Sequence, residues 1–159
     1  SLAAGWNLIS APIIPEENDV PRMFRQLVEA DALTIVKNDD GRFYIPEHNF
    51  NNIPFWDFRQ GYYVRMYENG SLLVEGEEVE VDTPIPLREG WNMVAYFPEE
   101  QIEVEDAFRN IEDVLIIVKN DAGQFYIHEI GFNNMRRLRR GKGYQVKVSE
   151  AVELVWNVP

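Results

Sequence analysis

The sequence contains no cysteine, which excludes a disulfide framework, a thiolate zinc site and a thiol nucleophile. Histidine is also scarce, because His48 and His128 are the only two, and neither stands in a metal-ligand spacing. No run approaches the ~18 consecutive apolar residues that a membrane-spanning helix needs. The sequence therefore predicts no catalytic residues, no metal site, no cofactor and no membrane insertion.

Positive charge is in short supply as well. The chain has 15 lysines and arginines against 27 aspartates and glutamates, which leaves a net charge of −12 at pH 7. Such a protein repels polyanions, so nucleic acid is not an expected partner. Hydrophobic residues at 45% and aromatic residues at 13% are typical of a globular protein, and 159 residues suffice for one medium domain or two small ones.

An internal repeat organises the chain. The segment Gly5–Ile9 (GWNLI) recurs as Gly90–Val94 (GWNMV), 85 residues later. Further blocks recur at an offset of 82 residues, namely IVKND, GRFYI as GQFYI, FNN, and the Gly-Tyr pair of the last strand. Collinear blocks indicate duplication, so we predict two units: residues 1–82, called repeat one, and residues 83–159, called repeat two.

Both repeats predict the same order of elements. Each Gly-Trp-Asn motif opens an apolar strand, apolar residues spaced by three and four positions over 20–31 indicate an amphipathic helix, and the loop 38–41 joins two strands in a hairpin. Alternation from Gly61 and a following Asn-Gly pair predict another hairpin into residues 72–74. The predicted fold class is α+β, with two tandem copies of a β-α-β-β-β-β module, each a small curved antiparallel sheet or half-open barrel with one helix.

The series of motifs resembles a known type of repeat. GWNLIS, a short helix, a hairpin and then QGYYV or GKGYQV are similar to the GWNLIS…GKGYWV tandem repeats of large exported and surface proteins of bacteria and some archaea. The resemblance covers nearly the whole chain, which differs from the pattern at Tyr63 and Gln145, where a tryptophan usually follows Gly-Tyr. It implies an extracellular or cell-surface location and a modular, non-enzymatic context.

The two ends of the chain differ in how much of a repeat unit they include. The connection from Glu77 to Leu87 has no counterpart after Pro159, and the chain begins partway through a unit. We therefore expect a piece of a longer polypeptide, or its C-terminal end.

Aromatic residues that recur in register are predicted to form a core in each repeat, because equivalent cores need equivalent volume. These residues are Trp6, Trp91, Phe43, Phe125, Tyr62 and Tyr144.

Aromatic residues found in one copy only are better candidates for ligand binding. Alternation along the last strand of repeat one directs Tyr62 inward and Tyr63, Arg65 and Tyr67 outward. With Trp56, these three residues form a candidate surface for stacking on sugar rings or on a protein partner. Packing against the other repeat is the alternative.

A basic cluster stands out in repeat two. Within seven residues lie Arg136, Arg137, Arg139, Arg140 and Lys142, at the position where repeat one has Phe55, Trp56 and Phe58. Such a cluster can bind a sulfated or uronic polysaccharide or an acidic partner, and a contact between the repeats is the alternative.

The sequence favours a non-catalytic structural or adhesive tandem module of a larger exported protein, which spaces, displays or docks neighbouring domains. Its expected partners are those domains, with a polysaccharide or a surface protein as further candidates. The alternative function is a carbohydrate-binding module that uses the aromatic residues of repeat one. A paired-carboxylate enzyme is not indicated, because a suitable pair can always be found among 27 acids.

Overall fold

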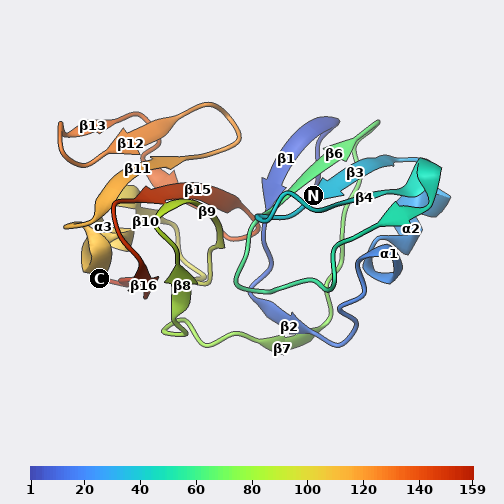
Figure 1. Ribbon diagram of the computed structural model, residues 1–159, viewed down its shortest axis with the longest axis horizontal. Helices are drawn as coiled ribbons and strands as arrows, with labels where there is room; N and C mark the ends of the chain where they lie inside the picture. The colour runs from blue at the N-terminus through green and yellow to red at the C-terminus, as the bar shows by residue number, and fades with distance from the viewer.

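The computed structural model describes all 159 residues, from Ser1 to Pro159. Repeat one and repeat two lie side by side along the long axis of the molecule (Figure 1). The chain is mostly β, with 39% of its residues in strands and 12% in helices, arranged in five separate sheets with three short α-helices. The predicted α+β class and its β-α-β-β-β-β module are therefore wrong.

The repeat is visible in the two large sheets. The first has the order β1-β6-β3-β4-β5 and the second the order β9-β15-β11-β12-β13, so strands that correspond in the sequence occupy corresponding places. All neighbouring strands are antiparallel. The strands are β1 (Gly5–Ile9), β6 (Tyr62–Met66), β3 (Leu33–Lys37), β4 (Phe43–Ile45), β5 (Phe50–Asn51), β9 (Gly90–Ala95), β15 (Gly143–Val148), β11 (Leu115–Lys119), β12 (Phe125–Ile127) and β13 (Phe132–Asn133).

Three two-stranded sheets complete the fold. They are β2 (Ile13–Pro15) with β7 (Gly76–Glu78), β8 (Ile85–Leu87) with β16 (Val152–Leu154), and β10 (Ile102–Glu103) with β14 (Arg137–Leu138). The predicted hairpin from β6 into residues 72–74 does not form. Because β6 already pairs with β1 on one side and β3 on the other, it has no free edge, and the chain that follows turns to other partners.

The predicted helix over residues 20–31 is broken. The segment forms α1 (Val20–Met23) and α2 (Arg25–Glu29), which meet at the fully buried Phe24. The sequence suggests Asn18 or Asp19 as the cap of this helix, and Asp19 is the cap, since its side chain accepts a hydrogen bond from the backbone N–H of Arg22. Repeat two has α3 (Val104–Ala107) followed by the 3₁₀ turn η2 (Arg109–Ile111). Helices this short are marginal in water, so packing of their apolar residues holds them in place.

The first predicted hairpin is confirmed in both repeats. Strand β3 pairs with β4, and β11 pairs with β12. The loops end on Gly41 and Gly123, whose φ angles of 75° and 78° lie in the left-handed region that glycine adopts easily. In each loop an asparagine side chain, from Asn38 or Asn120, accepts two backbone N–H groups and closes the turn.

Each repeat has its own hydrophobic core. The core of repeat one lies between its large sheet and its helices, and includes Phe24, Trp56 and Tyr62. The core of repeat two is larger, includes Phe108 and Trp156, and also takes in Val79, which precedes repeat two in the sequence. The repeat boundary predicted at residue 82 thus does not coincide with the limit of the second core.

The tryptophans of the Gly-Trp-Asn motifs are not core residues, so their predicted burial is wrong. Trp6 is 46% exposed and Trp91 is 42% exposed, whereas the asparagines that follow them are buried. The amide of Asn7 bonds to the backbone of Ala3, Gly5 and Val64, and Asn92 makes matching bonds to residues 88 and 90. The motif therefore begins strand β1 or β9, with its asparagine bonded to the preceding backbone and its tryptophan directed outward.

The other duplicated aromatics divide between core and surface. Tyr62 and Tyr144 are buried, as predicted. Phe43 and Phe125 are only half-buried, because they lie on the sheet surface that faces away from the core.

Candidate functional site

The outward surface of the first large sheet gathers an exposed tryptophan and two cations. Trp6 stands opposite Arg65 across β1 and β6, and Lys37 stands opposite Tyr63 across β3 and β6. Cross-strand partners share one face of a sheet, so all four side chains point the same way. The ammonium of Lys37 lies 5.5 Å from the Trp6 ring centroid, the guanidinium carbon of Arg65 lies 5.9 Å from it, and Tyr63 meets the indole edge-on.

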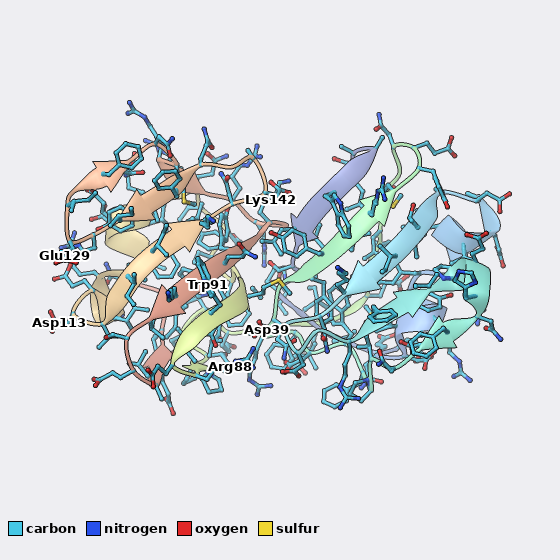
Figure 2. All side chains as sticks on the ribbon, turned by 45° about the horizontal axis from the view of Figure 1, so that its top comes forward. Asp39, Arg88, Trp91, Asp113, Glu129 and Lys142 are labelled. Carbon is cyan, nitrogen blue, oxygen red and sulfur yellow. The ribbon has the colours of Figure 1, made fainter.

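The second large sheet carries the same arrangement. Lys147 stands opposite Trp91, and the ammonium groups of Lys119 and Lys147 lie 5.5 and 5.8 Å from the Trp91 ring centroid. Lys119 corresponds to Lys37 in the repeat, and Lys147 replaces Arg65. Figure 2 shows Trp91 lying over β9 and β15, with the broad faces of the two large sheets side by side. We call these surfaces the tryptophan faces of repeat one and repeat two.

Both tryptophan faces continue across their sheets as a row of rings. In repeat one, Phe43 stands opposite Lys37, and Phe50 on the edge strand β5 packs on Phe43 with centroids 5.3 Å apart. In repeat two, Phe125 and Phe132 repeat this pair at 4.9 Å. With strands about 4.8 Å apart, each row crosses roughly 19 Å of sheet surface.

The cations of the tryptophan faces have no acidic partners. None of Lys37, Arg65, Lys119 and Lys147 lies within 4.0 Å of a carboxylate oxygen, although the protein has 27 acidic residues. Their charge is available to a ligand, held beside an exposed indole by cation–π attraction.

The four candidate ligand residues of repeat one do not form one surface. Trp56 is only 2% exposed and stacks on Tyr62 with centroids 3.9 Å apart, so its predicted role in ligand binding is wrong. Its counterpart in repeat two, Leu138, is also buried. Tyr63 and Arg65 do point outward as predicted and belong to the tryptophan face, whereas Tyr67 is exposed beyond the end of β6.

The basic cluster is largely neutralised within the protein. Arg137 pairs with Glu103, Arg140 with Glu78 and Glu99, and Lys142 with Asp121, while Arg136 and Arg139 have no carboxylate within 4.0 Å. The bond from Arg140 to Glu78 crosses from repeat two to repeat one. At the equivalent position, Phe58 packs on the core of repeat two. The segment therefore contributes to contact between the repeats, and the structure does not gather its five cations into a free anion site.

The repeats meet in a reciprocal junction, whose backbone contacts sequence reasoning did not predict. The backbone N–H of Leu8 donates to the carboxylate of Asp121 at 2.9 Å, and the backbone N–H of the equivalent Met93 lies beside the carboxylate of the equivalent Asp39. Ser10 N–H donates to the carbonyl of residue 141, and Ala95 N–H to that of residue 59. Each repeat thus offers the other the same groups, as the two partners do in a two-fold symmetric dimer. Asp39 and Lys142 lie where the two halves meet (Figure 2).

Two glycines from the Gly-Tyr motifs lie at the centre of the junction. A Cβ atom on Gly143 would stand 2.9 Å from the carbonyl oxygen of Ile9 and 3.1 Å from the Cα of Gly61, and one on Gly61 would stand 3.1 Å from the carbonyl oxygen of Val94. A side chain at Gly143 would force the backbones apart, and one at Gly61 would be tightly confined, so the repeated glycine serves the contact between the repeats.

The tyrosines that follow these glycines have a structural role. The hydroxyl oxygens of Tyr62 and Tyr144 accept hydrogen bonds from the backbone N–H groups of Asp57 and Arg139, both at 2.7 Å. Burial raises the pKa of both tyrosines, that of Tyr144 to about 12, so each stays a neutral phenol. They anchor the segments that form the junction.

Asp39 makes the junction sensitive to pH. Burial raises the pKa of its carboxyl, against the opposing effects of Arg88 and of the N–H of Met93. A raised pKa means that the folded protein binds the proton more tightly than the unfolded chain does. Asp39 therefore stabilises the fold at low pH, and this contribution is lost as the pH rises through the folded-state pKa.

We accordingly expect Asp39→Asn to gain stability relative to the native chain as the pH rises from about 3 through the acidic range. The amide keeps an oxygen for the N–H of Met93 and carries no buried charge. Urea unfolding of both proteins across this range measures the difference. Asp40→Asn, which removes the exposed carboxylate that also pairs with Arg88, separates the loss of an ion pair from the loss of the buried group. A stability difference that falls with pH would contradict the assignment.

Two further findings bear on the kind of site present. No group of three or more histidine, cysteine, aspartate or glutamate side chains is placed to hold a metal ion. The longest helix, α2, has five residues, and no helix qualifies as a membrane span.

No protein-family model, curated protein or solved structure matches this chain.

Proposed function

We propose that this chain is a non-catalytic structural or adhesive unit of a larger exported protein, in which the two repeats act as one rigid body that spaces or displays neighbouring domains. The reciprocal junction carries this proposal. A flexible linker would leave the repeats independent, whereas here backbone hydrogen bonds, closely apposed glycines and ion pairs join them.

Three other observations support this proposal. Asp39 is the one carboxyl whose pKa burial raises, and it is engaged in the junction. Among the tyrosines whose pKa values burial raises, Tyr62 and Tyr144 anchor the junction. The motif resemblance to GWNLIS…GKGYWV repeats supports export and a modular parent protein. The net charge of −12 argues against nucleic acid as a partner.

Rigidity can be measured with spin labels, because the native chain has no cysteine. The exposed, equivalent residues Glu47 and Glu129 lie in different repeats and can both be changed to cysteine and labelled. Pulsed electron paramagnetic resonance should give one narrow distance distribution between the two labels. A control pair within repeat one, Glu47→Cys with Glu68→Cys, sets the width expected for a single rigid unit.

A distribution between the repeats much broader than that of the control pair would contradict the proposal. It would mean that the repeats move independently and cannot set the spacing of the domains on either side.

A further inference from the structure

We propose that the two tryptophan faces are twin binding sites for a uronate polysaccharide, with Trp6 and Trp91 as the stacking platforms. The sites are built from residues other than the core residue Trp56 and the paired arginines of the basic cluster. The inference rests on the proposed function in taking the chain to be adhesive, and it adds the chemistry of the ligand.

The groups on each face match the two parts of a uronate sugar. The apolar C–H face of a pyranose ring can lie on an exposed indole, as ring faces do on aromatic side chains. The carboxylate at the edge of the sugar then lies within reach of the two cations beside that indole. Arg65 can bind a carboxylate through two N–H groups, and Lys37 adds a point charge from the neighbouring strand. Phe43 and Phe50 extend the stacking surface toward the sheet edge.

Duplication of the whole arrangement favours a polymer of similar units. Tryptophan, two cations and two packed phenylalanines recur on both sheets with nearly the same distances. Neither exposed tryptophan is needed to fill a core, so common packing does not explain why both copies have one. Two like sites on one body can hold two stretches of a repeating polymer, which raises the affinity for a polymer surface.

The overall charge selects among acidic polymers. A protein with a net charge of −12 repels a polymer of high charge density, so binding must depend on short-range stacking and a few local ion pairs. A polyuronate, with one carboxylate per sugar, meets that condition better than a heavily sulfated chain.

An acidic peptide fits the geometry less well. An extended peptide usually adds to the edge of a sheet, where unpaired backbone groups supply its hydrogen bonds. Trp6 and Trp91 lie on the edge strands β1 and β9, but their rings and the cations beside them stand on the sheet surface, which suits a ligand that binds by its ring faces. The edge of β1 is partly occupied by the junction, where the N–H of Leu8 bonds to Asp121.

The test is isothermal titration calorimetry of the full chain with a short oligogalacturonate. We expect about two oligosaccharides to bind per chain. Trp6→Ala and Trp91→Ala should each reduce this to about one with the remaining affinity little changed, and the double variant should bind none. Phe55→Ala removes an exposed ring outside both faces and should leave binding unchanged. Thermal unfolding checks that each variant remains folded.

Further ligands give the remaining outcomes. The fully methyl-esterified oligosaccharide keeps the sugar rings and loses the charge, so it should bind at least about tenfold more weakly than the oligogalacturonate. The double variant Lys37→Gln, Arg65→Gln should weaken binding of the oligogalacturonate at the site of repeat one by a similar factor, at least about tenfold. Undiminished binding by the double tryptophan variant would overturn the proposal. Tighter binding of heparin or of poly-glutamate than of the uronate would overturn the ligand assignment. A chain that binds no uronate but gives a narrow distance between spin labels would overturn this inference and leave the proposed rigid unit standing.

Discussion

Trp56→Ala is expected to lower the free energy of unfolding by about 3–5 kcal/mol, through lost burial and the cavity left behind. The indole is 2% exposed, stacks on Tyr62 and packs against Phe24 with centroids 6.0 Å apart. Its loss would also remove support from Tyr62, whose hydroxyl holds the backbone N–H of Asp57 beside the junction. Urea unfolding followed by circular dichroism measures the change.

Trp6→Ala is the matched control, because it deletes an indole of the same size from an exposed position. Surface substitutions of this kind usually change stability by about 0.5 kcal/mol or less, and here the loss of the cation–π contacts adds about 0.5–1 kcal/mol. Trp56→Phe should cost less than Trp56→Ala, since it keeps most of the ring and removes a buried indole N–H that has no hydrogen-bond partner. Equal costs at Trp6 and Trp56 would contradict the division between core and surface described above.

Gly143→Ala is expected to destabilise the protein by about 1–3 kcal/mol or more by forcing the repeats apart. The new methyl group would meet the carbonyl oxygen of Ile9 and the Cα of Gly61, both backbone atoms of the other repeat. Neither can move without breaking the hydrogen bonds of the junction. We expect the spin-label distance between the repeats to broaden in this variant, while the distance within repeat one stays narrow.

Gly70→Ala provides the comparison for this substitution. Its new methyl group would also meet close neighbours, at 3.0 and 3.1 Å, but these are the ends of the flexible side chains of Met66 and Leu27. They can rotate away, so the cost should be smaller. If Gly70→Ala were the more damaging of the two, the junction would not be the rigid contact that the proposed function requires.

Local signals in the sequence predicted local structure well. The hairpin loops at 38–41 and 120–123 need only a left-handed glycine and an asparagine that caps its own turn, and both residues lie within the loop itself. The Asp19 cap is equally local. The alternation of β6 correctly separated Tyr62 from Tyr63, because side chains on one strand alternate whatever its neighbours are.

Predictions that depended on distant neighbours failed. The Asn-Gly pair predicted a hairpin after β6, but β1 and β3 occupy both edges of that strand. No residue near the Asn-Gly pair indicates this pairing. The apolar spacing over residues 20–31 predicted one continuous helix. The structure has two short helices instead, with a break at the buried Phe24. The α+β class was predicted from that helix, so the class is wrong for the same reason.

The candidate site was recovered only in part. Outward-facing Tyr63 and Arg65 were predicted, but Trp6 was assigned to the core because it is duplicated. Duplication shows that both copies retain a residue, but it does not show whether the residue serves the core or the surface. The signal that would have found the site is joint recurrence, since Trp6, Lys37 and Phe43 all reappear in repeat two.

The sequence by itself determined the duplication, the scarcity of positive charge and the tight turns, because each depends on residue identity or on a few adjacent residues. The tertiary structure alone decided which aromatic rings are buried, which edges each strand has free and how the repeats meet. Burial of Trp56 and exposure of Trp6 depend on what packs above each strand, and the closeness of Gly61 and Gly143 depends on two segments 82 residues apart in the chain. These contacts join residues far apart in the sequence, and they form only when the chain folds and brings those residues together.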